Sequence, residues 1–222
     1  MTDRQAIRLF FFGDSICFGQ GVAVHLGWVA RISAALNEAA KEGGRPVMVS
    51  NPSINGNTTR QALERMPYDI QTQQADLLLV QFGMNDCNYW ETDRGVPRVS
   101  PKAFSANLEE IITRAFNFGV RRVILNTNHP TGRDAVEMPL AGVTYQQSNE
   151  RYNQLIREVS EGFGERVILN DMEARFRSQT GNNREALLKL VLPDLLHLSE
   201  AGHEVYFEAV YPSVKRAVEE FA

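Results

Sequence analysis

Five short apolar runs, each separated from the next by a stretch of helical period, constrain the fold of this chain more than any other feature. The runs cover residues 7–12, 46–50, 76–82, 122–126 and 166–169. Most of them lack alternation of polar and apolar residues, which is typical of strands buried on both faces. Strands that alternate with helices form parallel sheets covered by helices on both sides. The pattern therefore predicts a five-stranded parallel sheet with right-handed crossovers and strand order 2-1-3-4-5.

The stretches between these runs carry the start and stop signals of helices. The expected helices cover residues 28–41, 58–73, 101–118, 145–161 and 199–221. We expect Asn57 to cap the second helix, and Pro67 to kink or split it, because a proline inside a helix removes a backbone hydrogen bond. Ser100-Pro101 supplies a capping serine and a first-turn proline for the third helix. Two long loops, 87–99 and 130–143, are candidates for functional segments.

Length, charge and cysteine content narrow the class of protein. The chain has 222 residues without a repeat or linker, so we expect one domain over residues 1–222. A net charge of -4 argues against a nucleic-acid partner, which needs clustered Lys and Arg. Cys17 and Cys87 are too few for a disulfide framework and indicate free thiols in a reducing compartment. The run 7–12 is too short for a signal peptide or a membrane span. We therefore expect a cytoplasmic protein with no membrane partner; its oligomeric state is left open.

Small and amide residues follow the expected strands, at the places where a sheet of this kind presents its ligand site. The segments are Gly13-Asp14-Ser15, residues 51–56, residues 83–86, residues 128–130 and Asn170-Asp171. In open α/β sheets, ligands bind beyond the carboxyl ends of the strands. The sequence therefore predicts a serine, several backbone donors and an asparagine on one rim of the sheet.

A serine nucleophile needs a base, and His197 is the best candidate among the four histidines. Asp194 precedes His197 by three residues, a spacing at which its carboxylate can accept the ring N–H and fix the tautomer. Hydrolysis also needs hydrogen-bond donors for the oxyanion. The candidate donors are the backbone N–H groups of Ser15 and Gly56 and the side-chain amide of Asn85. The predicted catalytic residues are thus Ser15, Asp194 and His197.

Four blocks in the sequence, in the right order, resemble those of the SGNH hydrolases, also called the GDSL esterase/lipase family. They are Gly13-Asp14-Ser15-Ile16-Cys17-Phe18-Gly19, Asn51-Pro-Ser-Ile-Asn-Gly56-Asn-Thr, Gly83-Met84-Asn85-Asp86 and Asp194-Leu-Leu-His197-Leu-Ser-Glu-Ala-Gly202-His203. The resemblance implies a three-layer α/β/α, flavodoxin-like sandwich. It also implies esterase, thioesterase or related acyl-hydrolase activity without metal or cofactor. Cys17 departs from the family, whose members often carry Thr there. The Gly-x-Ser-x-Gly elbow of α/β-hydrolases is absent around Ser15.

The resulting hypothesis is a serine esterase that acts on a small soluble ester, either a short-chain acyl ester or a sugar O-acetyl group. An acyltransferase or thioesterase using the same residues is the alternative, followed by a non-catalytic flavodoxin-like binding module. Tyr89, Trp90 and His129 are candidates for lining the substrate pocket. Asp14 is expected to brace its turn. A metal at His197 and His203 is not supported, because their spacing differs from a helical i, i+4 zinc pair and no third ligand is evident.

Overall fold

A computed structural model describes residues 6–221 of the chain and contains a five-stranded parallel sheet. The strands are β1 (Ile7–Gly13), β2 (Val47–Ser50), β3 (Leu77–Gln81), β4 (Arg122–Asn126) and β5 (Val167–Asn170). Their order in the sheet is β2-β1-β3-β4-β5, and every neighbouring pair is parallel. The predicted strand order is therefore confirmed.

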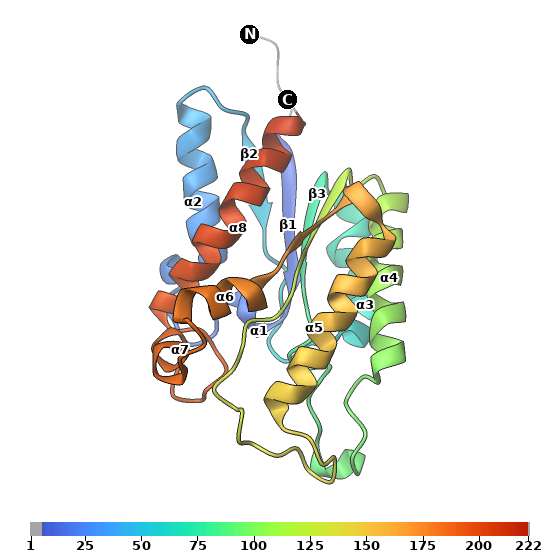
Figure 1. Cartoon of the computed structure of the whole chain (residues 1–222). Coiled ribbons are helices and arrows are strands. Elements are labelled where there is room, and N and C mark those ends of the chain that lie inside the picture. Colours follow the sequence, from blue (N-terminus) through green and yellow to red (C-terminus); the bar gives the residue numbers. More distant parts are fainter. Residues whose placement is uncertain (1–5, 222) are drawn as a thin grey trace.

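Helices connect the strands and pack on both faces of the sheet (Figure 1). The α-helices are α1 (Ser15–Phe18), α2 (Trp28–Lys41), α3 (Thr59–Asp69), α4 (Pro101–Asn117), α5 (Tyr145–Gly162), α6 (Met172–Thr180), α7 (Arg184–Leu190) and α8 (Glu200–Glu220). Short 3₁₀ turns are η1 (Val24–Leu26), η2 (Gln71–Gln73), η3 (Glu91–Asp93) and η4 (Gly164–Arg166). No helix within residues 6–221 is both long enough and apolar enough to span a membrane.

Two separate apolar cores lie on the two faces of the sheet, because successive side chains of a strand point to opposite sides. Leu9 and Phe11 of β1 belong to the core beneath α2 and α8. Phe10 and Phe12 belong to the core beneath α3, α4 and α5. Figure 1 shows these two helical layers on either side of the strands. The predicted three-layer α/β/α sandwich is thus confirmed.

The start of α3 differs from the sequence prediction. Thr58, rather than Asn57, is the N-cap, and it forms a capping box with Gln61. Pro67 lies inside α3 without splitting it, because the proline falls in the last turn and Ile70 N–H still closes that turn on the Met66 carbonyl at 3.0 Å. The helix ends at Asp69, so the expected segment 58–73 is one α-helix followed by the separate turn η2. Ser100 and Ser199 cap α4 and α8 as predicted.

Two short helices, α6 and α7, were not predicted from the sequence. The side chain of Asp171 caps α6, which ends at Gly181 with a φ of 59°. The side chain of Asn183 then caps α7. These helices follow β5 and bring the chain back across the carboxyl ends of the strands. They therefore position the segment 191–198, which precedes α8.

Candidate active site

Ser15 lies at the first position of α1, directly beyond the carboxyl end of β1. Asp14 is the N-cap, and its Oδ1 accepts a hydrogen bond from the Ile16 N–H at 3.0 Å. A side chain at position 13 would place its Cβ 2.7 Å from the Gln81 carbonyl oxygen, so the turn needs glycine to pack against β3. The turn thus fixes Ser15 at the rim of the sheet, where the residue is 5% exposed.

His197 lies in a tightly turned segment between α7 and α8. An isolated antiparallel bridge between Val191 and Leu198 closes the segment. Inside it, Oδ1 of Asp194 accepts hydrogen bonds from the backbone N–H groups of Leu196 and His197, each at 3.0 Å. The Asp194 carboxylate therefore orders the backbone that carries the imidazole, in addition to contacting the ring.

The three predicted catalytic side chains form one hydrogen-bonded chain. The second carboxylate oxygen of Asp194 is bonded to Nδ1 of His197, and Nε2 of His197 lies 3.0 Å from Oγ of Ser15. Because a carboxylate only accepts, Nδ1 carries the ring hydrogen and Nε2 is free to accept the Ser15 proton. Ser15 and His197 are 182 residues apart in the sequence. The structure thus brings together the two ends of the predicted site.

Asp194 is suited to remain ionised beside the imidazole. Partial burial alone would raise the pKa of its carboxyl, but the hydrogen bonds from His197 and from the Leu196 and His197 N–H groups outweigh burial and hold the pKa below its usual value. The side chain of Asp194 is 41% exposed, so solvent also stabilises its charge. A carboxylate that stays charged can stabilise an imidazolium formed on His197.

His129 does not line an open pocket, contrary to the sequence prediction. Its side chain is 0% exposed, because the ring points into the core on the α8 side. Nε2 lies 2.9 Å from the Leu196 carbonyl oxygen, and Nδ1 lies 3.0 Å from the Tyr206 hydroxyl. A carbonyl only accepts, so Nε2 donates and Nδ1 accepts from Tyr206. His129 is therefore a brace for the segment that carries His197, and burial lowers its pKa to about 4.

The two other predicted oxyanion donors lie in the segments that follow β2 and β3, the two strands that flank β1. Gly56 has a φ of 77°, which favours glycine, and no atom lies within 4 Å of the position of an added Cβ. The Ile54 N–H donates to the Gly13 carbonyl at 3.1 Å and so ties this segment to the end of β1. Asn85 follows β3, and its amide Nδ2 donates to Oδ2 of Asp14 at 3.3 Å. One amide hydrogen of Asn85 thus fixes its orientation, while the other has no protein partner among residues 6–221.

Asp14 and Asp86 are a pair of buried carboxyl groups, close enough for the charge of Asp86 to act on Asp14. Burial raises the pKa of Asp14 to about 7, although the hydrogen bonds from Ile16 and Asn85 oppose this rise. Burial also raises the pKa of Asp86 to about 6, against hydrogen bonds from Thr59. The Thr59 N–H and hydroxyl donate to Oδ1 of Asp86 at 2.9 and 2.5 Å. The expected bracing role of Asp14 is confirmed by its capping bond.

Arg65 is a positioning residue that no sequence motif indicates. Its guanidinium donates to the Pro52 carbonyl at 2.6 Å and to the Asn57 side chain at 2.8 Å. It also donates to the Gly13 carbonyl at 3.3 Å and lies 4.4 Å from the centre of the Phe12 ring. Arg65 therefore joins both sides of the Gly56 segment to β1. An arginine on a helix face is usually solvated, so no local pattern distinguishes it.

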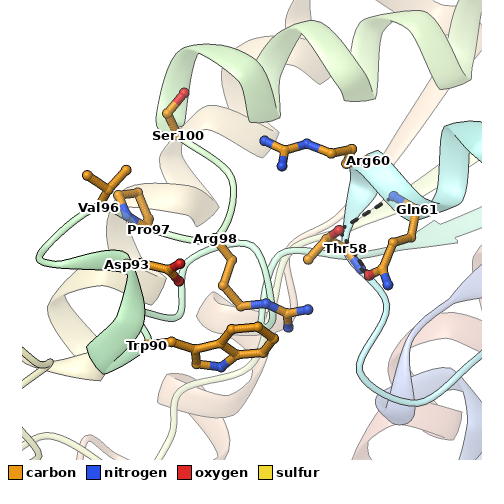
Figure 2. A pocket seen from close by; sticks show the side chains of 9 residues that line it. All are labelled: Thr58, Arg60, Gln61, Trp90, Asp93, Val96, Pro97, Arg98 and Ser100. Carbon is orange, nitrogen blue, oxygen red and sulfur yellow. Dashed lines mark hydrogen bonds between the residues drawn. The ribbon is translucent and has the colours of Figure 1, made fainter.

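Tyr89 and Trp90, the two aromatic residues of the loop after Asn85 that were predicted to line a substrate pocket, lie in different surroundings. Tyr89 is partly buried and packs against the core beneath α3, α4 and α5. Trp90 is 50% exposed and lines an open pocket of about 620 Å³ (Figure 2). The Arg98 guanidinium lies over the Trp90 ring, 4.2 Å from its centre. Trp90 therefore lines a pocket and Tyr89 does not line that pocket.

Comparison with protein families identifies the class to which this fold and this arrangement belong. The model of the GDSL-like lipase/acylhydrolase family matches residues 11–205. The chain therefore belongs to the GDSL-like lipase/acylhydrolase family, and the resemblance seen in the four sequence blocks is confirmed.

The individual proteins that the chain resembles share less than a third of their residues with it in the matched regions. The chain is 29% identical over 123 residues to an arylesterase of Vibrio mimicus, across 55% of this chain and 56% of that protein. It is 27% identical over 131 residues to the esterase TesA of Pseudomonas aeruginosa, across 59% of each. The matched region thus spans little more than half the length of these curated relatives. The solved structure of Axe2, an acetylxylan esterase from Geobacillus stearothermophilus, shares the fold, with a TM-score of 0.74, 22% identity and coverage of 97% and 96%.

Proposed function

We propose that this protein is a serine esterase that hydrolyses small soluble carboxylic esters through an acyl-enzyme on Ser15. The hydrogen-bonded chain from Asp194 through His197 to Oγ of Ser15 carries this proposal. A hydroxyl within hydrogen-bonding reach of an imidazole, which is in turn oriented by a carboxylate, is the arrangement that activates serine for acyl transfer. Membership of the GDSL-like lipase/acylhydrolase family and the similarity to proteins named as esterases support it.

The reaction proceeds in two half-reactions. Nε2 of His197 takes the proton of Ser15 as Oγ attacks the ester carbonyl carbon, and Asp194 stabilises the imidazolium. The N–H groups of Ser15 and Gly56 and the amide of Asn85 stabilise the oxyanion of the tetrahedral intermediate. His197 then protonates the leaving alcohol, which leaves an acyl group on Ser15. A water molecule, deprotonated by His197, hydrolyses this acyl-enzyme and restores the hydroxyl.

A short acyl group is the substrate class that we favour. The pocket beside the Gly56 segment is lined largely by polar and charged side chains, which do not suit a long hydrocarbon chain (Figure 2). The acetylxylan esterase named above, which shares the fold, is consistent with acetyl transfer on this scaffold. Initial rates on p-nitrophenyl esters from acetate to laurate measure the preference. We expect the highest kcat/KM at acetate or butyrate, and a maximum at octanoate or longer contradicts the short-chain proposal.

The esterase proposal is tested by covalent labelling and turnover together. A fluorophosphonate probe is expected to form a single covalent adduct with the chain, and mass spectrometry should locate it on the peptide that contains Ser15. The parent is expected to hydrolyse p-nitrophenyl acetate, and Ser15→Ala and His197→Ala to lose nearly all of this activity. His25 is exposed on the surface, so His25→Ala is the matched control and should behave as the parent. Unlabelled Ser15 in folded protein, or activity retained by Ser15→Ala, rejects the proposal.

A further inference from the structure

We propose that the pocket in Figure 2 is a subsite for a negatively charged group, a carboxylate or a phosphate, carried by the ester substrate. This inference rests on the proposed esterase function and specifies the substrate of the same site. It assigns a binding role to Arg60 and Arg98, neither of which takes part in the reaction described above.

Two guanidinium groups give the pocket its positive charge. Arg60 projects from the first turn of α3 and Arg98 from the loop that precedes α4, and both line the pocket. Within residues 6–221, neither of them forms an ion pair with a carboxylate. Arg60 has no hydrogen-bond partner there, while Arg98 donates one hydrogen bond, to the Gly56 carbonyl. Asp93 is the one acidic residue in the lining. A planar guanidinium with free N–H groups matches the oxygens of a carboxylate or phosphate.

Arg98 is held in place rather than freely solvated. One face of its guanidinium stacks on the Trp90 ring, 4.2 Å from the ring centre. Partial burial lowers the pKa of Arg98, while the charges of the buried Asp86 and of Asp93 oppose this effect. A partly desolvated cation gains more from an incoming anion than a fully solvated one does. Because Arg98 occupies one face of Trp90, that face is closed to a sugar ring, which favours an anion as the occupant.

Two helices direct their positive ends at the same pocket. Thr58 is the N-cap of α3, which has 11 residues, and Ser100 is the N-cap of α4, which has 17 residues. Both caps line the pocket beside the two guanidinium groups. The partial positive charge at a helix N-terminus favours an anion. The helices thus add to the field of Arg60 and Arg98.

The pocket is joined to the proposed oxyanion site by a direct contact. Nη1 of Arg98 donates to the carbonyl oxygen of Gly56 at 3.2 Å, while the N–H of Gly56 is a proposed oxyanion donor. An ester whose carbonyl oxygen lies at the Gly56 N–H would therefore have the pocket as its neighbour. A substituent on the acyl part or on the alcohol part of such an ester would extend toward Arg98 and Arg60.

Matched pairs of charged and neutral esters test this inference and distinguish the two parts of the substrate. p-Nitrophenyl hemisuccinate against p-nitrophenyl levulinate tests an anion on the acyl side. 4-Acetoxybenzoate against 4-acetoxybenzamide tests an anion on the alcohol side. We expect kcat/KM to favour the charged member of at least one pair by roughly ten-fold. The preference should shrink when salt is raised from about 0.05 M to about 0.5 M.

Variants assign the preference to the pocket. Arg60→Gln is expected to lower the ratio of charged to neutral kcat/KM by roughly five- to ten-fold, and Arg60→Lys to restore part of it. Asp93→Asn should raise the ratio, because it removes the opposing charge. Arg94 lies outside this pocket, so Arg94→Gln is the matched control and should leave the ratio as in the parent. An unchanged ratio in Arg60→Gln overturns the assignment.

The outcomes separate this inference from the esterase proposal. Hydrolysis of neutral esters without any preference for charged ones overturns the anion subsite alone. If none of these esters is hydrolysed, the esterase proposal is overturned. A binding measurement then tests whether the pocket is an anion subsite. Calorimetric titration of Ser15→Ala with benzoate, benzamide and inorganic phosphate is the binding measurement. We expect benzoate or phosphate to bind with at least roughly ten-fold lower Kd than benzamide. Binding of benzamide as tightly as both anions overturns the subsite.

Discussion

The two halves of the site use carboxyl groups in opposite ways. On the nucleophile side, Asp14 and Asp86 are 0% exposed, and burial raises their pKa values to about 7 and about 6. On the base side, Asp194 is partly exposed, and hydrogen bonds from His197 and from the backbone hold its pKa below the usual value, against the effect of partial burial. The same residue type is therefore placed in two environments with two consequences.

This difference indicates a division of tasks. The buried pair holds backbone N–H groups and the Asn85 amide in place, which requires acceptors but little net charge. The exposed Asp194 faces an imidazole that becomes cationic during the proposed reaction, which requires a permanent negative charge. Four substitutions and pH series test this division, beginning with the largest expected effect.

Asp194→Asn should be the most damaging change to a carboxyl group. Oδ1 of residue 194 accepts two backbone N–H groups, so the new amide nitrogen would face Nδ1 of His197. That nitrogen donates, which forces the ring hydrogen onto Nε2 and removes the acceptor for Ser15. We expect kcat for p-nitrophenyl acetate to fall by roughly 10³- to 10⁴-fold. The exposed Asp134→Asn is the control. A loss below about ten-fold would show that Asp194 only orders the turn.

Asn85→Ala should lower kcat by roughly 10²- to 10³-fold, because it removes one donor to the oxyanion. KM should change little, since the bond to the oxyanion forms fully only in the transition state. Steady-state kinetics on p-nitrophenyl acetate measure both constants. Asn37 is exposed on α2, so Asn37→Ala is the matched control. A change confined to KM would contradict the oxyanion role.

Asp14→Asn should lower kcat by roughly ten-fold, because the Ile16 N–H and the Asn85 amide bond to different oxygens of Asp14, and the amide nitrogen of the variant would face one of these two donors. The substitution mimics protonated Asp14, whose pKa is about 7. Protonation of Asp14 below this pH should add a further loss of activity in the parent, so log(kcat/KM) should fall more steeply with falling pH in the parent than in the variant. The variant has no carboxyl group at position 14 to protonate, so its pH profile should lack this step. Identical pH profiles would limit Asp14 to capping α1.

The smallest expected effect is on the pH dependence of stability, to which Asp14 on the nucleophile side and His129 on the base side contribute with opposite signs. Burial raises the pKa of Asp14 from 3.8 to about 7, so the unfolded chain holds fewer protons in this window and stability falls as pH rises. Burial lowers the pKa of His129 from 6.5 to about 4, so the unfolded chain holds more protons and stability rises as pH rises.

Removal of the Asp14 carboxyl or of the His129 imidazole should therefore reveal the contribution of the remaining group to the pH dependence of stability. Between about pH 4 and about pH 6.5, Asp14→Asn should make the free energy of unfolding rise more steeply with pH, and His129→Gln should make it rise less steeply. The difference in slope corresponds to at most a few kcal/mol across the window. Urea unfolding at several pH values measures it. Slopes that change in the same direction in both variants would contradict the assignment of opposite shifts.

The sheet was predictable because its signal is repeated along the whole chain. Each apolar run became a strand within one or two residues of its expected bounds, and parallel pairing followed from the intervening helices. The helices α6 and α7 were missed because they are short, with 9 and 7 residues, and because Asp171 and Asn183 cap them without a long apolar stripe. Caps alone are common in loops and do not distinguish a short helix.

The site residues that belong to recognisable sequence motifs could be predicted. Ser15, Asp194 and His197 were selected by their blocks and lie within one hydrogen-bonded chain. His129 was assigned to a pocket because it follows a strand, but the direction of its ring depends on packing against Tyr206, a residue 77 positions away. Sequence spacing carries no information on such contacts, which is also why Arg65 was not selected.

The hydrogen bond between His197 and Ser15 also has a consequence for biosynthesis. During translation, the strand that presents the hydroxyl leaves the ribosome early, while the imidazole is added 182 residues later. Domains generally fold as units, and a contact between distant positions forms only after the intervening chain has been made. Under the proposed mechanism the growing chain is therefore inactive until residue 197 has been added and the domain has folded, and we expect an activity-based probe to label only those chains that contain residue 197.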